Sequence, residues 1–363
     1  MSNNNKTPAI RFKGFTDTWE QREFDKVFLS FPNKNYQLQS TEYYESGKFP
    51  IIDQGKKAII GYSDNKSKVC NKYPSIIFGD HTTELKYVDF PFIIGADGVK
   101  TLSVKDGDTL FQYYNLQVNN VQPTGYNRHF SMLKEISLCV PCLAEQRQIG
   151  TYFRNLDTLI TLHQRKYDKL IQFKAAMLKK MFPQNGANKP EIRFKGFTDA
   201  WEQRELEEVI TVGNGMDYKH LSEGGIPVYG TGGYMLSVDK ALSYDKDAIG
   251  IGRKGTIDKP YILKAPFWTV DTLFYCIPKE DYSLDFVYCI FQNVNWKEKD
   301  ESTGVPSLSK VNINSTDVKV PTLAEQEKIG AYFEHLDSLI TLHQRKCDKY
   351  KSIKAGLIRK LFP

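Results

Sequence analysis

The chain contains one stretch of 41 residues twice, at residues 143–183 and again at residues 323–363, with 25 of the 41 positions identical. In the first copy, apolar or seam-type residues recur at alternating steps of four and three. These positions are Ile149, Phe153, Leu156, Ile160, His163, Tyr167 and Leu170, and the pattern resumes at Met177 and Met181. This spacing is typical of a heptad seam, so it predicts that each copy is one long helix packed against a partner helix.

Both copies carry helix boundary signals. Thr322, followed three residues later by Glu325, predicts a capping box at the start of the second helix, where the first copy has Cys142 instead of a threonine. Pro183 and Pro363 close the copies where a helix could not readily continue. About 39 helical residues span roughly 58 Å, which is longer than a small domain is wide. We expect the two copies to pair antiparallel within one chain, with a homodimer between chains as the alternative.

The repeat also includes the segment that opens each globular region. Residues 10–23 (IRFKGFTDTWEQRE) return at residues 192–205 with one change in fourteen positions. A polar leader precedes each opening segment, and the second leader, residues 184–190, is rich in Asn, Gly and Pro, as linkers often are. The sequence therefore predicts two equivalent units, divided into segments 1–142, 143–183, 184–322 and 323–363.

The globular regions diverge in sequence but keep a common outline. FPIIDQG at residues 49–55 parallels IPVYGTG at residues 226–232, and residues 74–82 parallel residues 247–256. Short runs of Ile, Val, Phe and Tyr between Gly, Asp and Pro are typical of strands and tight turns. We predict a mixed α/β fold used twice, in two similar globular domains separated by two long antiparallel coiled-coil helices with pseudo-two-fold symmetry.

Composition narrows the class of protein. The chain is 40% hydrophobic and 13% aromatic, which argues against disorder. Its start lacks the features of a signal peptide, and no apolar run approaches 18 residues, so we expect a soluble, cytoplasmic protein.

The six cysteines do not recur at matching positions in the two halves, and Cys139 and Cys142 form a C-x-x-C motif without a second pair. Reduced thiols without a metal are therefore expected.

The net charge of +6 lies on the predicted helices. Residues 143–183 hold eight basic and three acidic residues, and residues 323–363 hold eight basic and five acidic residues, which leaves the rest of the chain at −2. A basic excess favours a polyanionic partner, but it is also typical of a solvated coiled-coil face.

Two sequence motifs suggest chemistry on this chain, and neither is convincing. Gly250, Gly252 and Gly255 match G-x-G-x-x-G, but the residues that follow do not open a helix that could bind a pyrophosphate. Glu84 and Lys86, with Asp53 or Asp64, have the composition of a metal nuclease site, but the second half has no counterpart. We predict that the chain is not an enzyme and holds no metal.

The loops of the globular regions are better interpreted as binding surfaces. A shared framework with divergent loops is typical of two copies of one recognition domain that bind different targets. In the second half, phosphates and guanine could be bound by Arg253, Lys254 and Lys259. In the first half, base edges or a thymine methyl group could be contacted by Thr82 and Thr83, and a phosphate by Lys86. Before each long helix, Asn127 suits adenine, Arg128 suits guanine and Lys310 suits a phosphate. The candidate DNA-binding residues are His81, Thr82, Thr83, Lys86, Tyr126, Asn127, Arg128, His129, Arg253, Lys254, Thr256, Lys259, Ser307 and Lys310.

The layout of variable unit, helix, variable unit and helix resembles the specificity subunit of bacterial type I restriction-modification systems. The resemblance lies in P-x-L-A-E-Q-x-x-I-G, which opens at Pro141 and Pro321, and in the doubled RFKGFTD-x-WEQRE, and it covers nearly the whole chain. It implies that segments 1–142 and 184–322 are target-recognition domains for two unlike half-sites in double-stranded DNA. The long helices would then bind two methyltransferase subunits, and motor-nuclease restriction (R) subunits would join them.

The same resemblance implies that this chain carries no cofactor. S-adenosylmethionine would lie on the methyltransferase (M) subunits, which methylate adenine N6, and ATP and Mg would lie on the restriction subunits. Two other hypotheses remain open at this point. One is a coiled-coil scaffold without a nucleic-acid role, which the near-neutral globular regions favour, and the other is a self-contained metal nuclease that uses Glu84 and Lys86.

Overall fold

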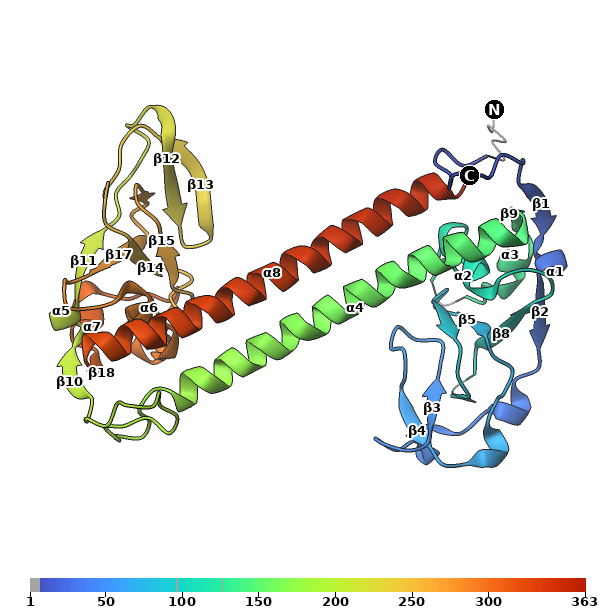
Figure 1. Cartoon of the computed structure of the whole chain (residues 1–363), viewed down its shortest axis with the longest axis horizontal. Coiled ribbons are helices and arrows are strands. Elements are labelled where there is room, and N and C mark those ends of the chain that lie inside the picture. Colours follow the sequence, from blue (N-terminus) through green and yellow to red (C-terminus); the bar gives the residue numbers. More distant parts are fainter. Residues whose placement is uncertain (1–6, 96, 126) are drawn as a thin grey trace. The chain divides into compact units, whose positions relative to one another are not determined.

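The computed structural model describes residues 7–95, 97–125 and 127–363. The chain divides into two compact units (Figure 1). Unit 1 comprises Met1–His163 and Arg345–Pro363, and unit 2 comprises Gln164–Gln344. Each unit therefore combines a globular part with portions of both long helices.

Unit 1 contains short strands, short helices and the start of one long helix. Its elements up to that helix are β1 (Glu20–Glu23), α1 (Phe24–Val27), β2 (Phe28–Phe31), η1 (Lys34–Tyr36), η2 (Ser40–Glu42), β3 (Phe49–Ile52), β4 (Gly61–Ser63), η3 (Lys66–Lys68), β5 (Ser75–Gly79), β6 (Leu85–Val88), β7 (Ile93–Ile94), β8 (Val99–Val104), α2 (Thr109–Val118), α3 (Phe130–Lys134) and β9 (Ser137–Val140). They form a four-stranded sheet in the order β2-β8-β5-β6, a three-stranded sheet in the order β4-β3-β7, and the pair β1-β9.

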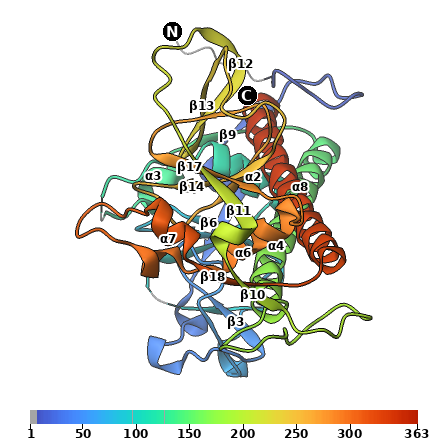
Figure 2. The ribbon, with the colours of Figure 1, turned by 90° about the vertical axis from the view of Figure 1, so that its left-hand side faces the viewer.

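Unit 2 repeats this plan. Its elements between the long helices are β10 (Glu202–Glu205), α5 (Leu206–Val209), β11 (Ile210–Asn214), β12 (Glu223–Gly230), β13 (Gly233–Val238), β14 (Ala248–Gly252), β15 (Tyr261–Leu263), β16 (Trp268–Thr269), β17 (Leu273–Pro278), α6 (Leu284–Asn293), η4 (Trp296–Lys299), α7 (Lys310–Asn314) and β18 (Asp317–Val320). The sheets have the orders β11-β17-β14-β15, β13-β12-β16 and β10-β18. Figure 2, in which unit 2 faces the viewer, shows the β12–β13 hairpin above β14 and β17.

The two units have the same strand order and the same pairing directions. In each unit the first strand of the three-stranded sheet pairs antiparallel with the second and parallel with the third, as β3 does with β4 and β7 and as β12 does with β13 and β16. The prediction of one mixed α/β fold used twice is therefore confirmed.

The duplicated opening segment places a tryptophan in each core. Trp19 is buried and its ring lies 6.1 Å from that of Phe362, near the end of the second copy. Trp201 is buried in the same way, with its ring 5.5 Å from that of Phe182, near the end of the first copy. Burying a large aromatic ring removes much apolar surface from water. Each core is therefore closed by the C-terminal end of the long helix that returns to it.

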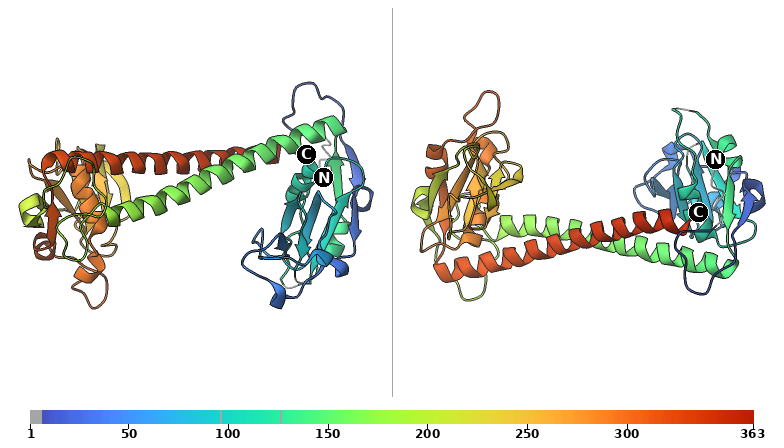
Figure 3. Two further views of the ribbon diagram at one scale, coloured as in Figure 1. Left: turned by 60° about the horizontal axis from the view of Figure 1, so that its bottom comes forward. Right: turned by 90° about the horizontal axis from the view of Figure 1, so that it is seen from above.

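The two long helices are α4 (Leu143–Lys180) and α8 (Leu323–Leu361). In unit 1, Asp157 of α4 binds Lys354 of α8 at 2.6 Å, and in unit 2, Lys174 of α4 binds Asp337 of α8 at 2.6 Å. Moving forward along α4 thus means moving backward along α8, and the colours of the two helices in Figure 3 let the reader follow these directions. The predicted antiparallel pairing is confirmed. Among the described residues, no helix is both long and apolar enough to cross a membrane.

The predicted heptad seam is also confirmed, although its residues serve two purposes. Every seam position is buried or half-buried. Ile149 and Phe153 join the core of unit 1, whereas His163 stacks on Tyr350 of α8 with ring centres 5.6 Å apart. Met181 joins the core of unit 2, with Met177 packed against it. The seam therefore lies in a globular core at both ends of α4 and faces the partner helix at His163.

Glu325, which is predicted to form a capping box with Thr322, binds an arginine far away in the sequence. Both carboxylate oxygens of Glu325 accept hydrogen bonds from Arg193, at 2.8 and 2.7 Å. In unit 1, Arg11 binds Glu145 in the same way, at 2.7 Å for both bonds. Each acidic residue at the third position of a long helix therefore fixes the duplicated opening segment to that helix.

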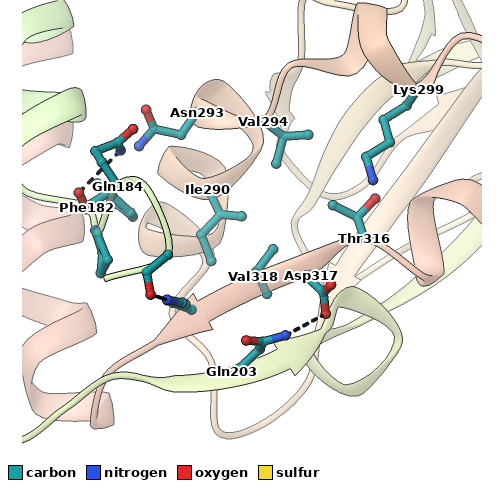
Figure 4. A pocket seen from close by; sticks show the side chains of 13 residues that line it. Phe182, Gln184, Gln203, Ile290, Asn293, Val294, Lys299, Thr316, Asp317 and Val318 are labelled. Carbon is teal, nitrogen blue, oxygen red and sulfur yellow. Dashed lines mark hydrogen bonds between the residues drawn. The ribbon is translucent and has the colours of Figure 1, made fainter. Parts of the chain in front are cut away.

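The junctions between helix ends and opening segments are equivalent. The amide of Ile192 donates to the carbonyl of Lys180 at 2.9 Å, and that of Ile10 donates to the carbonyl of Lys360 at 3.0 Å. The first junction is covalently continuous through residues 184–190, and the second joins the two ends of the chain. A pocket of about 530 Å³ lies beside the continuous junction (Figure 4). There Lys319 of β18 donates to the linker carbonyls of Gly186 and Ala187.

This equivalence predicts that the chain tolerates circular permutation. Residues 363 and 1 would be joined by about seven residues, the length of the 184–190 linker, and the chain would be reopened near Gly186. We expect the permuted chain to fold and to keep its target, because exposed polar linkers tolerate such cuts. Losing the Lys319 hydrogen bonds should cost about 1 kcal/mol. Urea unfolding and mapping of the methylated sequence check this result.

A control permutant reopened at Gly250, inside β14, should fail to fold, because it breaks the four-stranded sheet of unit 2. A permutant cut near Gly186 that folds but directs methylation to a different sequence would contradict the equivalence of the junctions.

Candidate nucleic-acid interface

In unit 1 the two predicted loops, residues 80–86 and residues 125–130, meet. The Nδ1 atom of His81 lies 3.1 Å from the carbonyl oxygen of Asn127. The amide of His129 donates to the carbonyl of Asp80 at 2.8 Å. The amide of Phe130 donates to the Oδ1 atom of Asp80, also at 2.8 Å. These loops come from separate segments of the sequence, and in the structure they form one surface. Tyr126 lies outside the described residues.

Asp80 is a buried residue that contacts both loops of this surface. It is 2% exposed, and its Oδ2 lies 3.7 Å from the Lys100 ammonium and 4.0 Å from the Arg128 guanidinium. Asp97 lies 3.8 Å from the same guanidinium. The Arg128 side chain is 64% exposed and beyond hydrogen-bond distance of both carboxylates. It is oriented by charge but remains accessible to a ligand.

The role predicted for His129 needs correction. Its side chain is 0% exposed. The backbone amide of Thr124 donates to Nε2 at 2.9 Å, so Nε2 is unprotonated and Nδ1 donates to the carbonyl of Asp80 at 3.0 Å. A buried neutral imidazole with both nitrogens engaged shapes the loop and offers no surface to DNA.

Two other predicted residues of unit 1 also have internal roles. Thr83 is buried and has φ +58°, a left-handed conformation that is rare for a β-branched residue, and its carbonyl accepts a hydrogen bond from Asn120. The Lys86 ammonium binds the carbonyl of Asp53 at 2.7 Å and its Oδ1 at 3.1 Å, so it is not free for a phosphate in this conformation. Thr82, partly exposed His81 and exposed Asn127 remain at the surface.

The residues of the alternative nuclease site are not arranged around a common point for a metal. Asp53 binds Lys86, and Asp64 accepts the backbone amide of Lys48 at 2.8 Å. Within residues 7–95, 97–125 and 127–363, no group of three His, Cys, Asp or Glu side chains is placed to hold a metal ion.

Unit 2 joins its two predicted loops through the backbone. Lys254 and Ser307 form an isolated antiparallel bridge. The amide of Gly255 donates to the carbonyl of Pro306 at 2.8 Å, and the amide of Leu308 donates to the carbonyl of Arg253 at 3.0 Å. The turn after β14 and the loop before α7 therefore lie side by side, as the turn after β5 and the loop before α3 do in unit 1.

The basic side chains on this surface are accessible. Arg253, Lys254, Lys259 and Lys310 are exposed, and Thr256 and Ser307 are half-buried. The Arg253 guanidinium lies 5.8 Å from the ring centre of Phe274, within the range of a cation–π contact that limits its motion. Lys310 opens α7, whose preceding residue Ser309 accepts the amide of Asn312 at 3.0 Å.

The glycine motif of this loop forms a turn between two strands. Gly250 and Gly252 lie in β14, and the next element is β15, not a helix. A Cβ atom at Gly252 would lie 2.0 Å from the carbonyl oxygen of Thr256, so the close approach of these backbones requires glycine. The spacing therefore reflects the geometry of the turn and not a dinucleotide site.

Asp300, which is not among the predicted site residues, anchors the second loop of unit 2. Its Oδ1 accepts the amides of Ser302 and Ser307 at 3.0 and 2.9 Å. These hydrogen bonds, first of all that from Ser307, lower the pKa of the Asp300 carboxyl. Asp80 has the equivalent task in unit 1. A local signal existed for Asp300, because Asp followed two residues later by Ser is typical of an Asx turn.

Two copies of one α/β fold, each with a pair of joined loops carrying exposed basic and amide side chains, define a modular nucleic-acid recognition protein. A family model described as "Type I restriction modification DNA specificity domain" matches residues 16–172 and 198–351. The chain belongs to this family, which confirms the predicted resemblance. It is a DNA-recognition component and not an enzyme.

Three known proteins are similar to this chain. The specificity subunit of the Escherichia coli type I restriction enzyme EcoR124I/EcoR124II is 22% identical in an alignment 371 positions long, which covers 88% of this chain and 89% of that protein. The S subunit of a type I restriction-modification system from M. genitalium has the same fold, with a TM-score of 0.71 and 20% identity over 98% of this chain and 99% of that chain. The HsdS subunit from Thermoanaerobacter tengcongensis aligns with a TM-score of 0.42 and 14% identity over 95% of this chain and 96% of that one.

Proposed function

We propose that the chain reads a bipartite, asymmetric target in double-stranded DNA for a type I restriction-modification complex. Segments 1–142 and 184–322 are the target-recognition domains, and each reads one half-site. Segments 143–183 and 323–363 dock two methyltransferase subunits. These subunits bind S-adenosylmethionine and methylate adenine N6, and restriction subunits that carry ATP and Mg join for cleavage. In this division of labour the chain itself needs no cofactor.

One observation carries the proposal of two unlike half-sites. Both units present the same pair of joined loops at equivalent places in the fold, but the side chains on them differ. Unit 1 exposes Asn127 and Arg128, whereas unit 2 exposes Arg253, Lys254 and Lys310. Bases are discriminated by the donors and acceptors that meet their edges, so different side chains on one framework favour different bases.

The helix surfaces support docking of two equivalent partners. Leu143 and Leu323, at matching positions, are both 41% exposed, and Leu162 and Leu342 are 45% and 43% exposed. Each copy of the repeat thus presents these two leucines at nearly the same exposure. Apolar surface kept in two equivalent copies favours two copies of one protein partner.

Mapping of methylated adenines tests this proposal. Cells that produce the chain with its methyltransferase should carry one methylated motif made of two unlike half-sites around an unread spacer, and cells that lack the chain should not. A methylation pattern that is the same without the chain, or a motif with identical half-sites, would contradict it.

A further inference from the structure

A third loop of unit 1, residues 53–57 between β3 and β4, joins the candidate interface through Gln54. The Oε1 atom of Gln54 accepts the amide of His81 at 3.1 Å, and its Nε2 donates to the carbonyl of Asp97 at 3.1 Å. Its own carbonyl accepts the Thr82 hydroxyl. A Cβ atom at Gly79 would lie 2.6 Å from this carbonyl oxygen, so the two loops are in close contact. The third loop is therefore part of the same surface.

Both units fasten this loop in the same way. In unit 1, Lys86 of β6 donates to the carbonyl of Asp53 at the end of β3, at 2.7 Å. In unit 2, the Tyr261 hydroxyl of β15 donates to the carbonyl of Gly230 at the end of β12, at 2.6 Å. Lys86 pairs with Ile77 of β5 and Tyr261 pairs with Gly250 of β14, which are matching positions in the two sheets. Burial raises the pKa of the Tyr261 phenol, which therefore stays a donor.

The loops differ in what they expose. In unit 1, Lys56 and Lys57 are both exposed, and within the part of the chain that the structure describes neither forms an ion pair. The equivalent tip of unit 2, residues 230–234, has the sequence GTGGY and no basic residue. These two adjacent unpaired lysines follow Gln54 closely on the anchored loop, and Gln54 itself contacts His81 and Thr82. The lysines therefore place positive charge next to the candidate interface, where a DNA backbone flanking the bases would pass.

We propose that Lys56 and Lys57 bind DNA phosphates next to the half-site read by unit 1, and that unit 2 has no such charged clamp. This inference rests on the proposed function, because it assumes that this surface meets DNA. Phosphate contacts position a protein on the duplex but do not read its sequence. The lysine pair therefore contributes affinity and salt dependence and leaves the recognised bases unchanged.

The test is the salt dependence of DNA binding by the complex of the chain with its methyltransferase. Neutralising two phosphates contributes about 1.8 to the slope of log K against log salt concentration, at about 0.9 per phosphate. We expect the double variant Lys56→Ala and Lys57→Ala to lose about this much slope on every target sequence tested. The double variant Lys56→Arg and Lys57→Arg should keep it, because arginine also binds phosphate.

The matched control is Lys34→Ala with Lys66→Ala, which removes the same charge from exposed positions on η1 and η3 of the same unit. Its slope should equal that of the wild type. An unchanged slope in the Lys56 and Lys57 double alanine variant, or an equal loss in the control, would overturn the clamp. If the wild-type complex itself shows no salt-dependent binding to its target, the proposed function fails instead.

Discussion

Replacing Arg253 by alanine is expected to relax recognition at one base pair of one half-site, about 5- to 150-fold. The estimate corresponds to the loss of one bidentate contact to guanine, about 1 to 3 kcal/mol. Arg253 suits this role because its guanidinium is exposed, lies over Phe274, and belongs to a turn pinned by backbone bonds to residues 306–308. Competition binding with targets changed at single positions, and mapping of the methylated motif, measure the effect.

The matched variant in the other unit is Arg128→Ala, which should relax the other half-site only. Lys240→Ala, which removes an exposed charge outside the joined loops, is the control and should leave both half-sites unchanged. If either arginine variant relaxes both half-sites together, the units do not read independently and the modular proposal is wrong.

The architecture could be predicted from the repeat because the signals in the repeat depend on residues close together in the sequence. Heptad spacing from Ile149 to Met181 depends only on helix geometry, and two matching seams in one chain favour one antiparallel pair. The duplicated opening segment alone likewise indicates two copies of one fold, whatever the positions of the strands. Features of this kind need no knowledge of distant contacts, and the structure confirms them.

The candidate site was less predictable because its polar groups are used by partners far away in the sequence. The His129 imidazole has nitrogens of the kind that can contact DNA, but both nitrogens already form hydrogen bonds, with Thr124 and Asp80. Lys86 is bound by Asp53, which lies 33 residues earlier. Side-chain chemistry alone does not say which donors are already satisfied inside the fold. Exposed residues such as Arg128 and Arg253 therefore remain the better candidates.

Glu325 shows the same competition at a helix end. Its position three residues after Thr322 is a local capping signal. The guanidinium of Arg193, 132 residues earlier, instead donates to both of its oxygens, and this raises the pKa of the arginine. A bidentate charged pair in a nearly buried place is stronger than one hydrogen bond to a backbone amide. The long-range contact therefore decides the conformation of the carboxylate.

Replacing Arg193 by alanine should consequently lower the free energy of unfolding of unit 2 by about 3 to 5 kcal/mol. Removing one partner of a buried ion pair leaves the other charge without compensation. Glu325 is 1% exposed, so its carboxylate could not regain water without local unfolding. Urea unfolding followed by tryptophan fluorescence measures the change, because Trp201, Trp268 and Trp296 lie in unit 2 and only Trp19 lies in unit 1.

Two further variants separate burial of charge from loss of an arginine. Arg204→Ala removes a more exposed arginine of the same unit, paired with Glu202, and should cost less than about 1 kcal/mol. The double variant Arg193→Met and Glu325→Met should recover most of the stability lost in Arg193→Ala, because no charge then remains buried. If Arg193→Ala is no more destabilising than Arg204→Ala, the ion pair does not fix the opening segment to the long helix. That contact would then follow from the apolar core around Trp201 and Phe182 alone.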